Sequence, residues 1–169
     1  MSILENKGIN GNQAKLLEIL TMFDGLCQEH DIEYFLAGGT CLGAVRHEGF
    51  LPWDDDIDLY MRTSVWEEKK WVIKEALSDQ YEIAFRELDP LYNNPIARIA
   101  DKNTTQYSRS RVTDSSTKGV MIEIFLLDPI PDDRDAYNEY RDNFWVWCEL
   151  QAPSMALSSE NPYTSDKVE

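Results

Sequence analysis

The chain has 169 residues, of which 43% are hydrophobic and 11% aromatic, and its 31 acidic residues against 16 Lys and Arg residues give a formal net charge of −15 at pH 7. The length and the apolar content predict one folded domain over residues 1–169 and exclude an intrinsically disordered chain. The acidic balance argues against a nucleic-acid partner, because binding to a phosphate backbone needs a cationic face.

The cysteines and the lack of long hydrophobic runs favour a reducing, intracellular compartment. Cys27, Cys41 and Cys148 lie far apart and form no CxxC pair, so neither a disulfide framework nor a cysteine zinc site is predicted. The N-terminal residues lack the apolar core of a signal peptide, and no apolar run approaches the roughly 20 residues that span a bilayer. We therefore expect a soluble, cytoplasmic protein.

The N-terminal part of the chain predicts a helix, a strand and a second, short helix. Residues 13–29 show helical spacing of their apolar side chains, which are Leu16, Leu20, Phe23 and Cys27. Residues 32–37 form a short apolar run that leads into Gly38-Gly39-Thr40, as a buried strand ending in a tight turn would. A short helix from about Cys41 to His47, closed by Gly49, is expected next.

The rest of the chain continues this alternation. Residues 56–61 alternate acidic and apolar side chains with period two, as a strand does. Ser64 and Glu67 predict a capping box for a helix that ends near Leu77 and buries Trp66 and Ile73. Further elements are expected as strands over 81–87, 96–100 and 120–127, a polar loop over 109–118, and a helix capped by Asp132 or Asp133 and reaching about Leu150. The pattern predicts a mixed α/β fold, with one sheet covered by helices.

The densest chemical signal is the run Asp54-Asp55-Asp56-Ile57-Asp58, with four carboxylates in five positions. Asp56 and Asp58 are two residues apart on the predicted strand, so their side chains should share a face. Carboxylates on one face suit Mg²⁺, with Mn²⁺ as the alternative, and such ions also bind substrate phosphates. An EF-hand that starts at Asp54 is excluded because Leu59 stands where that loop needs glycine. The competing interpretation is a solvated acidic loop.

Glu123 is the single acid in the apolar run 120–127. A buried carboxylate is costly unless it is neutralised or meets a cation, so Glu123 is the predicted third metal ligand. The competing interpretation is an edge position that faces solvent.

Several further residues are candidates for substrate binding. Gly38 and Gly39, followed by Thr40, would let backbone amides approach an anion at a helix N-terminus. Arg46 and His47 are candidate phosphate-binding cations, the competing interpretation of His47 being a surface imidazole.

Two side chains of this region are predicted to pack in the interior. Trp53 is expected in the core, and its alternative role is a cation–π contact with a trimethylammonium group. Cys41 is expected to pack beneath the glycine turn rather than to react.

The sequence resembles the LicD family, which includes bacterial phosphocholine transferases and, more distantly, fukutin-related sugar-phosphate transferases. The likeness is strongest over residues 34–58, which read YFLAGGTCLGAVRHEGFLPWDDDID. It continues through Asp101-Lys102-Asn103-Thr104 and through residues 119–128, which read GVMIEIFLLD, and it covers nearly the whole chain.

The resemblance implies a nucleotidyltransferase-like fold, a mixed β-sheet flanked by helices. In that superfamily a glycine turn precedes a strand with two metal-binding acids, which fall here on Asp56 and Asp58, and the third acid falls on Glu123. The family more often has Asp at position 123 and Pro where this chain has Leu126. Family members typically continue into an additional C-terminal region, which we expect this chain to lack.

The resemblance also implies a function, a metal-dependent phosphotransferase. It would move phosphocholine, or a related phospho-alcohol, from a CDP-linked donor to a hydroxyl of a cell-surface glycan, lipopolysaccharide or teichoic-acid precursor. Asp56 and Asp58 would hold Mg²⁺ on the pyrophosphate, Glu123 would complete the site and help to deprotonate the acceptor, and Arg46 would clamp a phosphate. A lipid-linked acceptor would bring the protein to the inner face of the membrane.

Two other functions stay open at this point. One is transfer of the nucleotidyl group itself to a small phosphorylated or sugar substrate. The other is a catalytically idle protein that binds a nucleotide or a metal ion.

Overall fold

The computed structural model describes residues 9–89, 92, 95–106 and 118–143, which fall into two compact units. The first unit contains a five-stranded sheet and the helices that pack on it. The second unit is described over residues 129–143 and contains a helix over residues 134–143. Whether the chain is a single domain over its full length stays a prediction.

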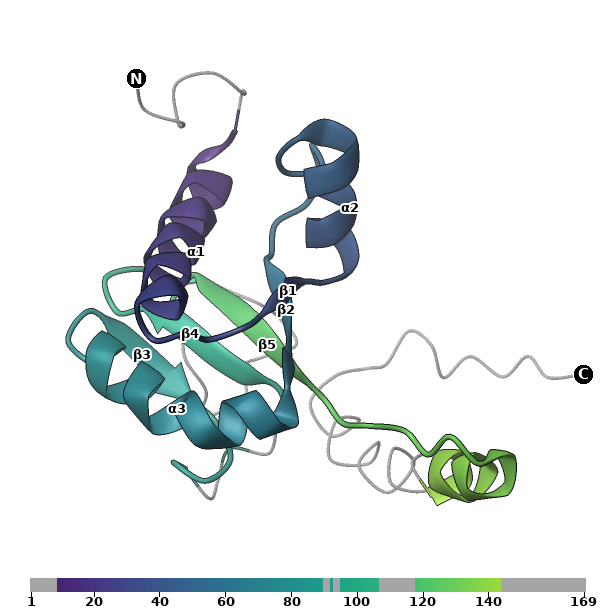
Figure 1. Cartoon of the computed structure of the whole chain (residues 1–169). Coiled ribbons are helices and arrows are strands. Elements are labelled where there is room, and N and C mark those ends of the chain that lie inside the picture. Colours follow the sequence, from purple (N-terminus) through teal and green to yellow (C-terminus); the bar gives the residue numbers. More distant parts are fainter. Residues whose placement is uncertain (1–8, 90–91, 93–94, 107–117, 144–169) are drawn as a thin grey trace, which may run out of the picture. The chain divides into compact units, whose positions relative to one another are not determined.

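The first unit is a mixed sheet with strand order β1-β2-β5-β4-β3 (Figure 1). β2 and β5 pair in parallel, and the other neighbouring strands pair in antiparallel fashion. Its elements in chain order are α1 (Gly11–Glu29), β1 (Phe35–Leu36), α2 (Gly38–His47), β2 (Asp58–Arg62), α3 (Thr63–Leu77), β3 (Tyr81–Ala84), β4 (Ala97–Asp101) and β5 (Met121–Leu127). This arrangement confirms the predicted mixed sheet flanked by helices.

Helices α1 and α3 cover one face of the sheet, as Figure 1 shows. Alternate residues of the central strands point to them, and all are buried: Leu59 and Met61 from β2, Ile99 from β4, Ile122 and Ile124 from β5. The helices contribute buried residues at helical spacing, including Leu16, Ile19 and Phe23 from α1 and Trp66 and Ile73 from α3. Because side chains alternate along a strand, the residues between these point to the opposite face of the sheet. We call this opposite surface the second face.

Helix α1 begins as its sequence dictates. Asn10 caps it, since its Oδ1 accepts a hydrogen bond from the Gln13 backbone N–H at 2.9 Å. The Gln13 side chain returns the contact by accepting from the Asn10 backbone N–H at 3.2 Å, which completes a capping box. The helix therefore starts at Gly11, two residues before the predicted start.

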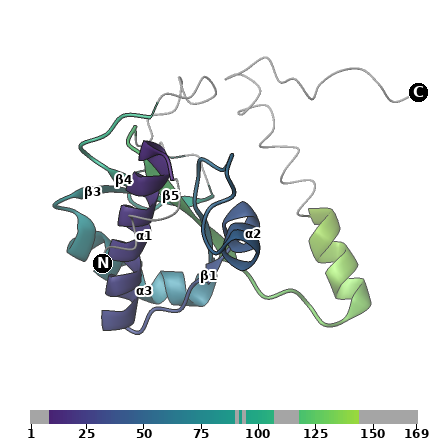
Figure 2. The same ribbon diagram turned by 90° about the horizontal axis from the view of Figure 1, so that it is seen from above.

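Helix α2 differs from the prediction at both ends. It begins at Gly38 with a φ of 44°, so the predicted glycine turn is the first turn of the helix. At its C-terminus the left-handed residue is Glu48, with a φ of 51°, rather than Gly49. Cys41 is exposed, so the prediction that it packs in the interior was wrong. Figure 2 shows α2 beside β1, and Figure 1 shows it apart from α3.

The strands and α3 also differ in detail from the prediction. β1 contains only Phe35 and Leu36, and β2 begins at Asp58, so Asp56 precedes the strand. The capping box predicted for Ser64 and Glu67 was wrong, because α3 follows Arg62 as its N-cap and no side chain of the described residues caps it. Glu67 instead accepts a hydrogen bond from Lys70 Nζ at 2.7 Å.

The remaining predictions can be compared only in part. β3 ends at Ala84, earlier than predicted, and the loop predicted over 109–118 lies outside the described residues except for Lys118. In the second unit Asp133 Oδ1 accepts from the backbone N–H of Ala136 at 2.9 Å, which confirms the predicted cap. Residues 144–150 of that predicted helix lie outside the described part. None of the described helices is long and apolar enough to cross a membrane.

Candidate active site

A row of charged side chains crosses three neighbouring strands on the second face. Asp58 of β2 lies opposite Glu123 of β5, and Glu123 lies opposite Arg98 of β4. Neighbouring strands are about 4.8 Å apart, and residues in direct register share a face, so these side chains lie next to one another. We call Asp58, Glu123 and Arg98 the charged row. It lies entirely within the first unit.

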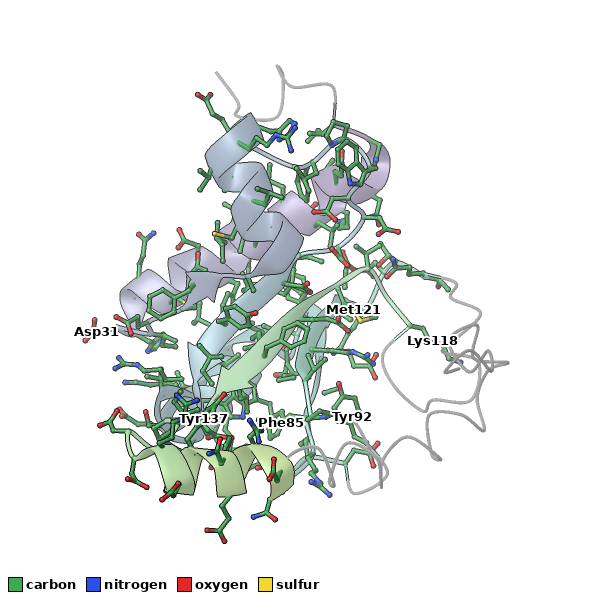
Figure 3. All side chains as sticks on the ribbon, turned by 90° about the vertical axis from the view of Figure 1, so that its right-hand side faces the viewer. Asp31, Phe85, Tyr92, Lys118, Met121 and Tyr137 are labelled. Carbon is green, nitrogen blue, oxygen red and sulfur yellow. The ribbon has the colours of Figure 1, made fainter. Side chains whose placement is uncertain are left out.

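Arg98 is the partner that the sequence interpretation missed. Its Nε donates to Glu123 Oε1 at 2.8 Å, and the two side chains are 6% and 14% exposed. The guanidinium lies 5.9 Å from the ring centroid of Tyr92, whose hydroxyl donates to the Ile96 carbonyl (Tyr92 is labelled in Figure 3). The carboxylate in the apolar strand is thus balanced by a cation in the next strand. A signal was present, because Arg98 is the single cation in the run 96–100.

The loop that carries the acids is held by two amide side chains at the start of α1. Gln13 is buried, and its Nε2 donates to the carbonyls of Leu51 at 3.2 Å and Asp54 at 2.8 Å. Asn12 Nδ2 donates to the Asp55 carbonyl at 2.8 Å. Sequence analysis did not single out these residues, although Gln13 continues the buried spacing of Leu16. A polar residue on an apolar stripe indicates a buried acceptor nearby.

The first turn of α2 lies against the same acids. Thr40 Oγ1 accepts a hydrogen bond from the Asp58 backbone N–H at 3.0 Å, which joins this turn to the start of β2. A Cβ at Gly39 would stand 2.7 Å from Asp54 Oδ2, and one at Gly38 would stand 3.6 Å from Asp58 Oδ2. Glycine at position 39 therefore allows a carboxylate to approach the N-terminus of the helix, where the helix dipole favours negative charge. The structure brings these predicted residues and the acids together.

The acids influence one another electrostatically. Burial raises the pKa of Asp58 to about 6, and the negative charges of Asp56, Glu123 and Asp54 add to this effect. Burial also raises the pKa of Asp56, with contributions from Asp54, Asp55 and Glu123. Like charges at short range disfavour ionisation, so the cluster at neutral pH holds more negative charge than it can easily accommodate. A bound cation would relieve this repulsion.

The donor set fits a divalent cation in its chemistry. Asp54 Oδ2 is buried and has no hydrogen-bond partner among the described residues, and carboxylate oxygens are the ligands that Mg²⁺ prefers. Within the described residues, however, no three acidic, imidazole or thiol side chains are placed to hold a metal ion together. Glu123 is engaged by Arg98. A metal site formed by Asp56, Asp58 and Glu123 therefore stays a prediction.

The other predicted binding residues lie farther from the charged row. Arg46 and His47 are exposed in the last turn of α2, and Arg46 lies about 12 Å along the helix axis from Gly38. Trp53 is 73% exposed, so the prediction that it packs in the core was wrong. Leu51, which is 5% exposed, fills the interior position of this loop instead. The structure thus leaves Trp53 available to a ligand.

A cavity of about 190 Å³ lies between α1 and α2. Its walls are mainly apolar and include Leu17 and Leu20 from α1, Ala44 from α2, and Phe50. Thr40 also lines it, and the same residue contacts the Asp58 backbone. Apolar walls do not suit a phosphate, so we place the candidate site at the acids and not in this cavity.

The residues of this site lie within a region that is similar to known proteins. The chain matches the LicD/FKTN/FKRP nucleotidyltransferase domain over residues 31–148, a span that contains the charged row, the acidic loop and the first turn of α2. It is 34% identical over 124 residues to the lipopolysaccharide cholinephosphotransferase LicD of Haemophilus influenzae, covering 72% of this chain and 44% of that protein.

A shorter match, 40% identical over 52 residues, joins it to an uncharacterised protein of Rickettsia prowazekii, covering 30% of this chain and 20% of that protein. The chain thus spans less than half the length of the curated relatives that it matches. Because the matched family span includes more than half of the chain, the protein belongs to the LicD/FKTN/FKRP family and matches its nucleotidyltransferase domain.

Proposed function

We propose that the charged row and the acidic loop form the metal-dependent site of a phosphotransferase. The reaction would move phosphocholine, or a related phospho-alcohol, from a CDP-linked donor to a hydroxyl of a lipopolysaccharide or other cell-surface glycan precursor, teichoic acid included. The observation that carries the proposal is the register of Asp58 against Glu123, beside an acidic loop held against the first turn of α2. The similarity to a cholinephosphotransferase supports the choice of phosphocholine.

The proposed chemistry is an in-line displacement at phosphorus. The oxygen of the acceptor hydroxyl forms a bond to the β-phosphorus of the donor, the bond from that phosphorus to the bridging oxygen breaks, and CMP leaves with the bonding electrons. A divalent cation would stabilise the negative charge of the phosphates.

Each residue of the candidate site would have its own role in this reaction. Asp56 and Asp58 would hold the cation. Glu123, whose Oε1 accepts a hydrogen bond from Arg98 Nε, would receive the acceptor proton. The backbone amides of Gly38 and Gly39 would face a phosphate oxygen. Arg46 and His47 would have to reach back along α2, so we give them a secondary role in phosphate binding.

A second candidate function is nucleotidyl transfer. The description of the matched family as a nucleotidyltransferase domain favours it. The same acids would serve this reaction, since it also passes through a charged phosphoryl group. The two reactions differ in the phosphorus that is attacked: the β-phosphorus for phosphocholine transfer and the α-phosphorus for nucleotidyl transfer.

Hydrolysis of CDP-choline in ¹⁸O-labelled water separates these functions. Water replaces the unidentified acceptor, and mass spectrometry locates the label after incubation with Mg²⁺ or Mn²⁺. Label in phosphocholine supports the proposed function, and label in CMP supports nucleotidyl transfer. The matched control is the Asp56→Ala, Asp58→Ala double variant, which should yield no labelled product.

Calorimetry of the same variants tests the binding step. CDP-choline should bind the wild-type protein only when Mg²⁺ is present, and the double variant should lose this dependence. Metal-dependent binding without any labelled product would favour the catalytically idle interpretation. A folded wild-type protein that binds no CDP-choline under either condition would contradict the proposal.

A further inference from the structure

Three aromatic side chains lie side by side on the second face, next to the charged row. Phe35 of β1 is in direct register with Tyr60 of β2, and Tyr60 is in register with Phe125 of β5. The three therefore share one face of three neighbouring strands. We call Phe35, Tyr60 and Phe125 the aromatic row.

The aromatic row is accessible to a ligand. Phe35 is 48% exposed and Tyr60 is 37% exposed, which is unusual for large rings that are adjacent on one sheet face. The rings of Tyr60 and Phe125 meet edge to face, with centroids 6.2 Å apart and planes inclined at 77°. Two rings in this edge-to-face arrangement present both a π-face and a ring edge to a small group.

The aromatic row runs parallel to the charged row. Tyr60 follows Asp58 by two residues in β2, and Phe125 follows Glu123 by two residues in β5, so each ring stands about 6.6 Å along the strand from a carboxylate. Two cations of the described residues near the rings are already paired with acids: Arg62 with Glu33 at 2.7 Å, and the charged-row arginine with Glu123. The charges of these two arginines are therefore balanced and do not oppose a cation over the rings.

We infer that the aromatic row binds the quaternary ammonium group of the transferred alcohol, an inference that rests on the proposed function. Ring faces attract such a cation through their quadrupole. A quaternary ammonium has no N–H donors, so it loses no hydrogen bonds against apolar walls. A primary ammonium would have to leave its N–H groups unsatisfied there.

The dimensions agree with this placement. In phosphocholine, four covalent bonds separate phosphorus from nitrogen, which gives a distance on the order of 5 Å. This is close to the two-residue step along a strand, about 6.6 Å, that separates the charged row from the aromatic row. A phosphate bound at the acids would therefore place the ammonium over Tyr60. The alcohol subsite then lies on the sheet face and not at Trp53, whose alternative role was a cation–π contact.

The test compares two CDP-alcohols that differ in the ammonium group with CDP, which carries no alcohol. Calorimetry with Mg²⁺ measures the binding of CDP-choline, CDP-ethanolamine and CDP to the wild-type protein and to the Tyr60→Leu and Phe125→Leu variants. We expect each variant to weaken CDP-choline binding about tenfold while CDP binding stays constant. Tyr60→Phe should retain the wild-type affinity, because it keeps the ring. Trp71→Leu, which removes an aromatic that is 51% exposed on α3, is the matched control and should not change binding.

Two outcomes of the calorimetry would overturn the inference. Equal weakening of CDP and CDP-choline would mean that the row stacks the base, and loss of choline preference in Trp53→Leu alone would move the subsite to that loop. An NMR experiment without nucleotide tests the aromatic row independently of the proposed function. Choline chloride should shift the ring NMR signals of Tyr60 and Phe125, whereas ethanolamine hydrochloride should not, even if no nucleotide binds. Absence of that difference would refute the aromatic subsite regardless of the outcome for CDP-choline.

Discussion

Replacing Asp58 by Asn should stabilise the metal-free protein at neutral pH. The pKa of Asp58 is raised to about 6 because the carboxylate is partly buried and lies among other negative charges. Asn keeps the shape of the side chain and removes its charge. The backbone N–H of residue 58, which donates to Thr40, is unaffected by the change.

The sign and size of the effect follow from the pKa. The folded protein binds a proton at Asp58 more tightly than the unfolded chain, so the contribution of this group to stability falls as the pH rises from 3.8 through about 6. This difference corresponds to about 3 kcal/mol at most. Solvent screening of a partly exposed group reduces it to about 1–2 kcal/mol. For a chain of this size, that is a rise in Tm of about 2–6 °C.

The assay is thermal unfolding in EDTA and low salt, at pH 7.5 and at pH 4.5. Asp58→Asn should unfold at a higher temperature than the wild type at pH 7.5, and this difference should be roughly a third as large at pH 4.5. Asp79→Asn, at an exposed acid outside the cluster, controls for the general loss of one negative charge. The reasoning is wrong if both variants shift Tm equally at pH 7.5, or if Asp58→Asn is the less stable protein there.

A metal ion should reduce the stability advantage of the Asp58→Asn variant. Mg²⁺ at ten times its Kd should add about 1.4 kcal/mol to the wild-type protein. Asp58→Asn should gain less, because it lacks one proposed ligand. An equal gain in both proteins would place Mg²⁺ elsewhere.

Three further substitutions test the parts of the site. Gly39→Ala places a methyl group 2.7 Å from Asp54 Oδ2. This variant should lose the rise in Tm caused by Mg²⁺ while its circular dichroism spectrum stays unchanged. A retained rise would show that Mg²⁺ binding does not need the close approach of Asp54 to residue 39. Gln13→Leu removes the amide donors to the acidic loop and should cost about 1–3 kcal/mol in urea unfolding, and a smaller loss would mean that the loop is held by other contacts. Arg98→Met should lower the free energy of unfolding by about 3–5 kcal/mol, because the Glu123 carboxylate loses its guanidinium partner. The double variant Arg98→Met, Glu123→Gln should recover most of this stability. If it does not, the loss is due to packing.

The buried face of α1 and the strand β5 could be predicted from the local spacing of apolar residues alone. Leu16 and Phe23 recur at helical spacing and are fully buried, and the apolar run around Ile122 forms a central strand. Burial of apolar area drives both elements, and the spacing of side chains along a helix or a strand is fixed by backbone geometry. The acids at 56 and 58 could likewise be identified as candidates from their density.

Contacts between distant segments could not be predicted in this way. The pairing of Arg98 with Glu123 depends on the register of β4 against β5, which no local pattern reports. The hydrogen bonds from Gln13 to the acidic loop join residues about 40 positions apart. Trp53 was misassigned because hydrophobicity alone could not show that Leu51, two residues earlier, takes the interior position.

The sequence by itself determined the mixed α/β class, the acidic run with its glycine-rich neighbour and the family to which the chain belongs, since these depend on residue type and short spacing. The tertiary structure decided which residues are neighbours. It set the charged row beside the aromatic row, started β2 at Asp58 instead of Asp56, and made the glycines the first turn of α2. Strand register and the packing of loops depend on free-energy differences summed over the whole core, so they are not encoded in any single segment.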